Sequence, residues 1–230
     1  MTSNIYLAFD IDGTIYDAGD ILEASFREGV MSFIEGGFGK SLHTPTKDEI
    51  IATLGFTLDD IFITLFPLLT KDDRIRLSLI CTDNLVNMIR AKKGRLIDGV
   101  YDTLKKLHAM NFNMLVASNG ARDYVEAILE TYNIKRFFSE PFIYTGGNIN
   151  NKTDIIGRYI ELNPERRLIM IGDRATDLNA AKENNIPFIG CAFGHAGDDE
   201  IKGERYIIRS FIEIIDILER SLLPGRYTEF

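Results

Sequence analysis

The stretch Ile5-Tyr6-Leu7-Ala8-Phe9-Asp10-Ile11-Asp12-Gly13-Thr14 begins with an apolar run and ends with two carboxylates, a glycine and a threonine. An apolar run of this length without polar alternation predicts a strand buried on both faces, as in a parallel sheet covered by helices. Open sheets of this kind bind ligands at the carboxyl ends of their strands. We therefore expect Asp10 and Asp12 at the edge of a sheet where a ligand would bind.

Asp10 and Asp12 are separated by one residue, and this pair is the most informative feature of the sequence. Crowded carboxylates raise the pKa of one acid unless a cation neutralises the pair. Mg²⁺ prefers hard oxygen ligands, so the pair indicates either a bound magnesium ion or a shared proton. Taken alone, the Asp-x-Asp-Gly fragment also fits a solvated turn, and the rest of the chain must decide between these interpretations.

The composition narrows the class of protein. With 230 residues, of which 45% are hydrophobic, the chain can bury a full core as one domain or two. A net charge of -8 and a pI near 5.0 disfavour binding to nucleic acid or to an anionic membrane, because like charges repel. Cys81 and Cys191 lie far apart in unrelated contexts and predict neither a disulfide nor a zinc site. The sequence shows no leader and no apolar run of about 18 residues, so we expect a cytoplasmic protein.

The segment from Asp20 to Arg90 has the pattern of about four helices. A capping residue followed three positions later by an acidic residue predicts helix starts at Asp20, Thr46, Thr57 and Thr70. Glycines predict helix ends at residues 36–37, 55 and 94. Apolar residues at three- and four-residue spacing predict a core stripe of Leu22, Phe26, Val30 and Phe33.

After Gly94 the sequence alternates between strand and helix patterns, as in a parallel sheet. Strands are expected at residues 113–118, 142–145, 168–172, 188–191 and 206–208. Helices are expected at residues 100–110, 122–132, 153–160, 175–184 and 211–220. The predicted fold class is therefore α/β, with a Rossmann-like, doubly wound and mainly parallel sheet formed by residues 1–15 and 95–230. Residues 16–94 are expected to form an inserted all-α cap, a helical bundle placed to act as a lid.

Polar residues suited to a phosphate group follow the later strands. Ser118-Asn119-Gly120 precedes a helix, where a hydroxyl and exposed N–H groups can hold an anion, although Ser118 also fits a plain N-cap. Gly172-Asp173 and Asp177 place two more acids at the same edge, since Asp177 lies about one helical turn after Asp173. Lys152 opens a further helix and by itself would fit a surface lysine.

Four motifs follow one another along the chain: Asp10-x-Asp12-Gly13-Thr14, Ser118, Lys152, and Gly172-Asp173 with Asp177. Together and in this order they resemble the four signature motifs of the haloacid dehalogenase superfamily. Most members of that superfamily are Mg²⁺-dependent phosphatases, and the motifs span nearly the whole chain. The insertion after the first motif resembles the superfamily's helical cap of the first type, as in relatives of phosphoglycolate phosphatase and β-phosphoglucomutase. The resemblance implies hydrolysis of a small phosphorylated metabolite through an aspartyl-phosphate intermediate on Asp10.

The resemblance also implies a role for each matching residue. Asp10 is the expected nucleophile, and Asp12 is the acid expected to protonate the leaving alcohol. The expected Mg²⁺ ligands are Asp10, the backbone carbonyl of Asp12 and Asp173, whereas Asp177 is expected to orient Lys152 or metal-bound waters. The expected phosphate-binding residues are Thr14, Ser118, Asn119 and Lys152.

Several residues outside the motifs carry expectations of their own. Arg174 stands where relatives often have a small residue. It could reach the substrate, but we expect it to pair with a neighbouring carboxylate. The run Asp198-Asp199-Glu200 is expected to be solvated, although the loop of residues 194–200 follows a core strand and could border the pocket. His195 is expected to be a surface or packing residue. Gly55 and Lys40 are candidates for cap residues that face the substrate.

Three alternative functions remain open at this point. A sugar-phosphate mutase would use the same aspartyl-phosphate but return the phosphoryl group to a second hydroxyl of the substrate. A non-catalytic phospho-acceptor, as in signalling receiver domains, would keep the phosphoryl group, and a binding protein on the same scaffold would perform no chemistry. The large helical insertion and the complete set of acids favour the phosphatase. The sequence determines neither the substrate nor the oligomeric state, and it indicates no nucleic-acid or membrane partner.

Overall fold

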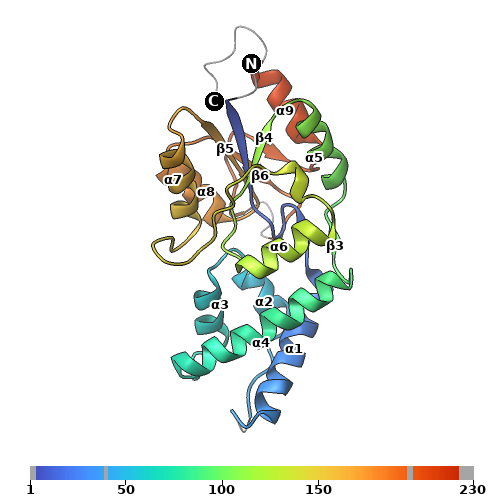
Figure 1. The fold of residues 1–230 in the computed structure, drawn as a ribbon, viewed down its shortest axis with the longest axis vertical. Coiled ribbons are helices and arrows are strands. Elements are labelled where there is room, and N and C mark those ends of the chain that lie inside the picture. The colour runs from blue at the N-terminus through green and yellow to red at the C-terminus, as the bar shows by residue number, and fades with distance from the viewer. Residues whose placement is uncertain (1–3, 39–40, 196–198, 223–230) are drawn as a thin grey trace.

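The predicted buried strand, β1 (Ile5–Phe9), lies inside a parallel sheet. The computed structural model describes residues 4–38, 41–195 and 199–222. In these residues the sheet has the strand order β4 (Asn113–Val116), β1, β5 (Arg167–Gly172), β6 (Phe188–Cys191) and β7 (Ile207–Ile208) (Figure 1). All neighbouring strands run parallel, which confirms the predicted α/β class.

Helices cover both faces of this sheet (Figure 1). One face carries α5 (Val100–Ala109) and α9 (Glu213–Leu222), and the other carries α7 (Lys152–Leu162) and α8 (Ala175–Glu183). After β4 the chain forms α6 (Arg122–Thr131) and a short 3-10 helix at Lys135–Phe137. Within the part of the chain that the structure describes, no helix has both the length and the apolar character of a membrane span.

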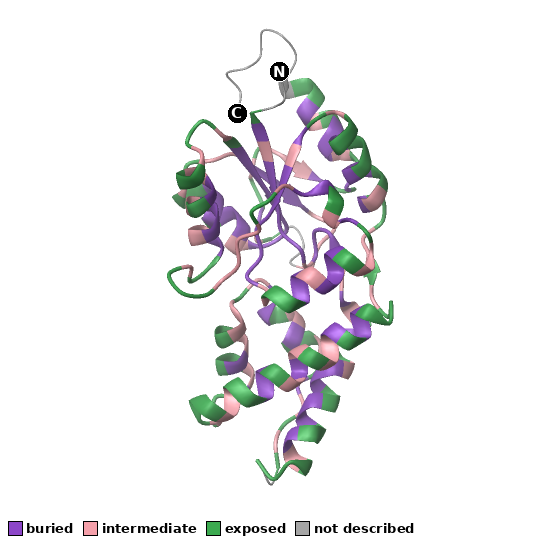
Figure 2. Cartoon of the chain, viewed as in Figure 1, coloured by how far each residue is buried: buried purple, intermediate pink, exposed green. Residues whose placement is uncertain are grey.

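The burial of β1 explains its uninterrupted apolar sequence. Leu7 and Phe9 pack in the core cluster that contains residues of α5 and α9, whereas Ala8 packs with residues of α7 and α8. Successive residues of a strand point to opposite faces, so both faces of β1 need apolar side chains. Figure 2 shows the resulting buried centre, with exposed residues on the outer sides of the helices.

Four helices between β1 and β4 pack on one another at the carboxyl edge of the sheet (Figure 1). They are α1 (Gly19–Glu35), α2 (Lys47–Thr53), α3 (Leu58–Leu65) and α4 (Lys71–Arg90). The predicted stripe on α1 is buried, and the side chains of Thr46, Thr57 and Thr70 cap the next three helices as expected. The start predicted at Asp20 is wrong, because α1 already begins at Gly19 and Asp20 lies in its first turn.

Two short strands that the sequence did not predict join the entry and the exit of the four-helix segment. β2 (Tyr16–Asp17) and β3 (Arg95–Leu96) pair in antiparallel orientation. Arg95 Nη2 lies 2.9 Å from Asp17 Oδ2, but this ion pair is largely exposed and adds little stability. Each of these two strands joins one apolar residue to one charged residue, so no apolar run marks it in the sequence.

The strand expected at residues 142–145 is wrong, because the structure has no strand in this segment. The backbone N–H of Ile143 donates to the hydroxyl of Tyr159 on α7 at 3.2 Å, so its hydrogen bond goes to a side chain. The rings of Phe142 and Tyr144 stack with their centroids 6.5 Å apart. The apolar residues therefore pack against the core without extending the sheet, a distinction that an apolar run by itself does not reveal.

We expect Ile171→Ala to destabilise the protein by about 3 kcal/mol, because it leaves a cavity where the side chain of this β5 residue is fully buried. The matched control is Ile63→Ala on α3, where the side chain is 49% exposed and the loss should stay below about 0.5 kcal/mol. Urea unfolding of both variants measures the difference. Equal losses would contradict the assignment of β5 to the centre of the core.

Candidate active site

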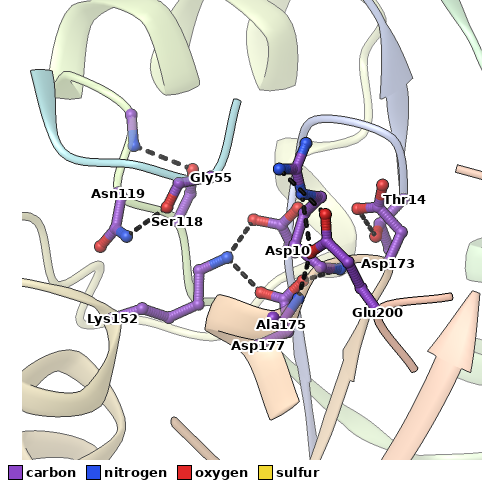
Figure 3. Close-up of polar contacts among 12 residues, drawn as sticks. Asp10, Thr14, Gly55, Ser118, Asn119, Lys152, Asp173, Ala175, Asp177 and Glu200 are labelled. Carbon is purple, nitrogen blue, oxygen red and sulfur yellow. Dashed lines mark hydrogen bonds and ion pairs between the residues drawn. The ribbon is translucent and has the colours of Figure 1, made fainter. Parts of the chain in front are cut away.

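Residues that are far apart in sequence meet at the carboxyl ends of β1, β4 and β5 (Figure 3). Asp10 follows β1, Ser118 follows β4 and Asp173 follows β5. Lys152 is the first residue of α7, and Asp177 lies in the first turn of α8. Because β1 lies between β4 and β5, these strand ends are neighbours in space.

Lys152 bridges two carboxylates in the interior of the protein. Its Nζ lies 2.6 Å from Asp10 Oδ1 and also donates to Asp177 Oδ1 (Figure 3). The Lys152 side chain is only 2% exposed, so the interpretation as a surface lysine is wrong. Burial alone would lower the pKa of Lys152, but the two carboxylates outweigh burial and raise it. Lys152 is therefore a charged residue that holds α7 and α8 against the end of β1.

Asp177 is held in place by its second oxygen as well. Its Oδ2 accepts a hydrogen bond from the backbone N–H of Arg174 at 2.9 Å, while Oδ1 faces Lys152. A Cβ atom at Gly172 would lie 2.2 Å from Asp177, so a larger residue would displace this carboxylate. Both oxygens of Asp177 thus have partners within the protein.

Asp173 is fully buried between two loops. Its Oδ1 accepts a hydrogen bond from the Thr14 hydroxyl at 3.3 Å, and its Oδ2 accepts one from the backbone N–H of His195 at 2.8 Å. A Cβ atom on Gly13 or on Gly194 would lie 2.3 Å from Asp173, and Gly13 also has a φ of 79° that favours glycine. The Thr14 hydroxyl therefore faces Asp173, and a role of Thr14 in phosphate binding stays a prediction.

Asp10, Asp173 and Asp177 form a cluster with the chemistry of a metal site. Each offers a carboxylate oxygen, and these oxygens lie within 4.8 Å of one another. Burial raises the pKa of Asp10 well above its ordinary value although Lys152 opposes the shift. Burial and the neighbouring Asp177 raise the pKa of Asp173 to about 7. A buried, all-oxygen cluster with more acids than cations fits a hard divalent cation such as Mg²⁺.

Asp12 has a different environment from the cluster. Its Oδ1 accepts a hydrogen bond from the hydroxyl of Tyr124 on α6, and its side chain is half-buried. Burial raises the pKa of Asp12, although the hydrogen bond from Tyr124 opposes this shift. A raised pKa keeps a carboxyl group protonated at higher pH, which suits a group that donates a proton.

Ser118 and Asn119 occupy the turn between β4 and α6. Ser118 Oγ accepts the backbone N–H of Gly120 at 3.1 Å. The N-cap of α6 is Ala121, so the interpretation of Ser118 as a plain N-cap is wrong. Asn119 Nδ2 donates to the carbonyl of Gly55 at 2.7 Å and thereby connects this turn to the four-helix segment.

Arg174 also connects the two parts of the chain. Its Nε donates to Glu200 Oε2 at 3.2 Å and its Nη1 donates to the carbonyl of Ile51 on α2 at 3.2 Å. The expectation that Arg174 pairs with a neighbouring carboxylate is confirmed. The expectation that Glu200 is solvated is wrong, because it is half-buried against Arg174; Asp198 of the same run lies outside the described residues.

A partly open cavity lies between the strand ends and the four-helix segment. Asp10, Asp12 and Ser118 line one side, and residues of α1 to α4 line the other. Gly55 also borders the cavity, whereas Lys40 lies outside the described residues.

Three residues that contact the site were missed in the sequence. Tyr124 is an aromatic residue on an amphipathic helix, a pattern that also describes an ordinary core residue. His195 contributes its backbone N–H, which every residue type except proline can supply, so its side chain carries no signal. Glu200 lies in an acidic run, and only its position near Arg174 in the folded protein reveals the ion pair.

The family profile described as haloacid dehalogenase-like hydrolase matches residues 7–191, a range that contains the strand ends and the acids of the site. The chain belongs to this family. The resemblance seen in the sequence is therefore confirmed, and the protein is an enzyme of the hydrolase class.

Individual proteins are similar to this chain over most of its length. The chain is 22% identical to the pyrophosphatase PpaX of Halalkalibacterium halodurans, covering 91% of this chain and 94% of the relative. It is 24% identical to a phosphoglycolate phosphatase of Salmonella typhi, covering 82% of this chain and 81% of the relative. A haloacid dehalogenase-like family hydrolase from Streptococcus pneumoniae shares the fold with a TM-score of 0.76 and 20% identity, covering 95% of this chain and 100% of that structure.

We expect the stability of the metal-free protein to fall as the pH rises from about 4 to 7. Asp173 has an ordinary pKa of 3.8 that is raised to about 7 in the folded protein, so the folded state binds its proton more tightly than the unfolded state. Such a group destabilises the fold with rising pH by up to about 1.4 kcal/mol per pH unit. The free energy of unfolding of Asp173→Asn, measured by urea unfolding with a chelator present, should therefore depend less on pH than that of the wild type.

The matched control for this pH dependence is Asp123→Asn, which changes an exposed carboxylate on α6. It should keep the wild-type slope. Equal slopes for the wild type and Asp173→Asn would contradict the raised pKa of Asp173.

Proposed function

We propose that this hydrolase is a cytoplasmic, Mg²⁺-dependent phosphatase that acts on a small phosphorylated metabolite through an aspartyl-phosphate intermediate on Asp10. The observation that carries the proposal is the convergence of Asp10, Asp12 and Ser118 on one open cavity, with Lys152 in contact with Asp10. The relatives that are named phosphatases support phosphoryl chemistry at this site.

Asp10 and Asp12 divide the proposed reaction between them. A carboxylate oxygen of Asp10 attacks phosphorus, the bond from phosphorus to the ester oxygen breaks, and Asp12 gives its proton to the leaving alcohol. In the second step Asp12 takes a proton from water, the water oxygen attacks phosphorus, and the bond to Asp10 breaks to release phosphate. The raised pKa of Asp12 supports its role as the acid of the first step.

Lys152 and Ser118 are proposed to bind the oxygens of the phosphoryl group, together with the backbone N–H of Asn119. The Lys152 ammonium group is already fixed beside Asp10, so it places positive charge where the phosphoryl group would arrive. Asp177 holds the other side of Lys152, which supports the proposed role of Asp177 in orienting this lysine.

Asp10, the backbone carbonyl of Asp12 and Asp173 are proposed to hold the Mg²⁺ ion. The buried carboxylates at this position fit such an ion by charge and by ligand type. When bound, Mg²⁺ would neutralise the acids and stabilise negative charge on the transferring group. The hydrogen bonds from Thr14 and His195 fix the orientation of Asp173 for that purpose.

Residues 16–94 are proposed to act as a cap over a catalytic unit formed by residues 1–15 and 95–230. The hydrogen bond from Asn119 to Gly55 and the contact of Arg174 with α2 join the two proposed units beside the cavity. A cap in this position would exclude water and shape the substrate site.

A mutase that acts on sugar phosphates is a weaker candidate. Sugar hydroxyls need hydrogen-bonding partners in a buried site. The cap side of the cavity offers the hydroxyls of Thr53 and Thr82 among mainly apolar residues. This lining favours transfer of the phosphoryl group to water.

We expect Asp10→Asn to lower turnover of an aryl phosphate by at least about 1,000-fold, because the amide is a poor nucleophile. The release of phosphate by the wild type should also stop when Mg²⁺ is removed with a chelator and return when it is added. Asp123→Asn is the matched control and should remain active. An unchanged rate in Asp10→Asn would refute the proposed mechanism.

We expect Asp12→Asn to lose activity in a manner that depends on the leaving group. General acid catalysis contributes about 100- to 10,000-fold, and an alkyl alcohol needs the proton more than a phenol does. Asp12→Asn should therefore lose more activity toward an alkyl phosphate than toward an aryl phosphate, and it should accumulate the phosphoenzyme with the aryl substrate. Intact-protein mass spectrometry detects that adduct, and equal losses for both esters would argue against Asp12 as the acid.

A further inference from the structure

The cavity beside Asp10 has two chemically different sides. Its α/β side carries the carboxylates of Asp10 and Asp12 and the hydroxyl of Ser118. The side formed by the four-helix segment is mainly apolar and includes Phe26, Phe56, Leu58, Ile61, Phe62 and Leu85. A substrate whose phosphate lies at Asp10 would therefore place its organic part against apolar side chains of the four-helix segment.

No lysine, arginine or histidine lines this cavity among the residues that the structure describes. Lys152 is enclosed by Asp10 and Asp177, and Arg174 is held by Glu200. Among the described residues, the only acidic or basic side chains that line the cavity are therefore those of Asp10 and Asp12. A second anionic group on the substrate would lose its hydration there without gaining a cationic partner.

Some of the apolar lining is accessible to a ligand. Phe56 is 38% exposed, and Leu58, Ile61 and Leu85 are half-buried. The buried rings of Phe26 and Phe62, which also line the cavity, stack with their centroids 5.4 Å apart. Exposed apolar side chains beside polar reactive groups are typical of a binding site rather than of a closed core.

We propose that the substrate is a phosphate monoester of a small, uncharged, apolar alcohol, and that Leu58, Ile61 and Leu85 bind its hydrocarbon part. This inference rests on the proposed phosphatase function and names the substrate class of the same site. It also separates this enzyme from its named relatives, because phosphoglycolate carries an additional carboxylate and pyrophosphate carries a second phosphate in place of an alcohol.

The primary test compares kcat/KM for ethyl, butyl and hexyl phosphate with the values for phosphoglycolate and pyrophosphate. Each added methylene should raise kcat/KM by about threefold until the cavity is filled, because hydrocarbon leaves water for an apolar surface. Phosphoglycolate and pyrophosphate should be at least about 100-fold poorer than hexyl phosphate.

A charge placed in the cavity tests the assignment of the lining. Leu85→Lys should raise the ratio of the kcat/KM for phosphoglycolate to that for hexyl phosphate by about 10-fold or more, because it supplies a cationic partner and removes apolar contact. The matched control is Leu79→Lys on the same helix, which is 63% exposed and does not line the cavity. It should leave the ratio at the wild-type value.

The outcomes distinguish this inference from the function on which it rests. The apolar substrate class would be overturned by equal kcat/KM values across the alkyl series. It would also be overturned if phosphoglycolate or pyrophosphate were the better substrate. In either case, Asp10-dependent hydrolysis of an aryl phosphate would still support the phosphatase. Loss of Asp10-dependent hydrolysis for every ester, including the aryl phosphate, would overturn the proposed function itself. If Leu85→Lys does not fold, the wild-type series still decides the question.

Discussion

The buried contact of Lys152 with Asp10 and Asp177 is the interaction on which the rest of the site depends. It joins the end of β1 to the first turns of α7 and α8, which are far apart in sequence. Removing one partner from a buried ion pair leaves an uncompensated charge, so the three side chains constrain one another. The same contact places a cation beside the carboxylate that faces the cavity, and the stability of the arrangement is thereby linked to its chemistry.

Close approach of loops to the acids is a second constraint. Gly13 and Gly194 lie on either side of Asp173, and Gly172 makes room for Asp177, at distances that a Cβ atom would not permit. These glycines allow the carboxylates to be buried together instead of pointing into solvent. Burial raises the pKa values of Asp10 and Asp173, because the ionised carboxylates lose their hydration. A divalent cation would stabilise these ionised forms.

The four-helix segment adds a property that the acids do not supply. Its apolar residues lie opposite Asp10 across one cavity, and Asn119 and Arg174 hold the segment in that position through backbone carbonyls of Gly55 and Ile51. Reactive side chains at the strand ends and apolar side chains of the helices therefore line the same cavity. The residues proposed for catalysis and the residues proposed for substrate selectivity therefore belong to separate parts of the chain.

The sequence by itself determined the α/β class, the buried first strand and the order of the motifs, because hydrophobic periodicity and turn residues act locally. It also indicated Asp10, Ser118, Lys152 and Asp173 as site residues. Local patterns misassigned residues 142–145 as a strand, since an apolar segment can pack against a core without pairing. Only the tertiary structure decided that Lys152 is buried, that Tyr124 contacts Asp12 and that the side of the cavity formed by the four-helix segment is mainly apolar. Those features depend on which distant surfaces meet, and spacing along one chain does not contain that information.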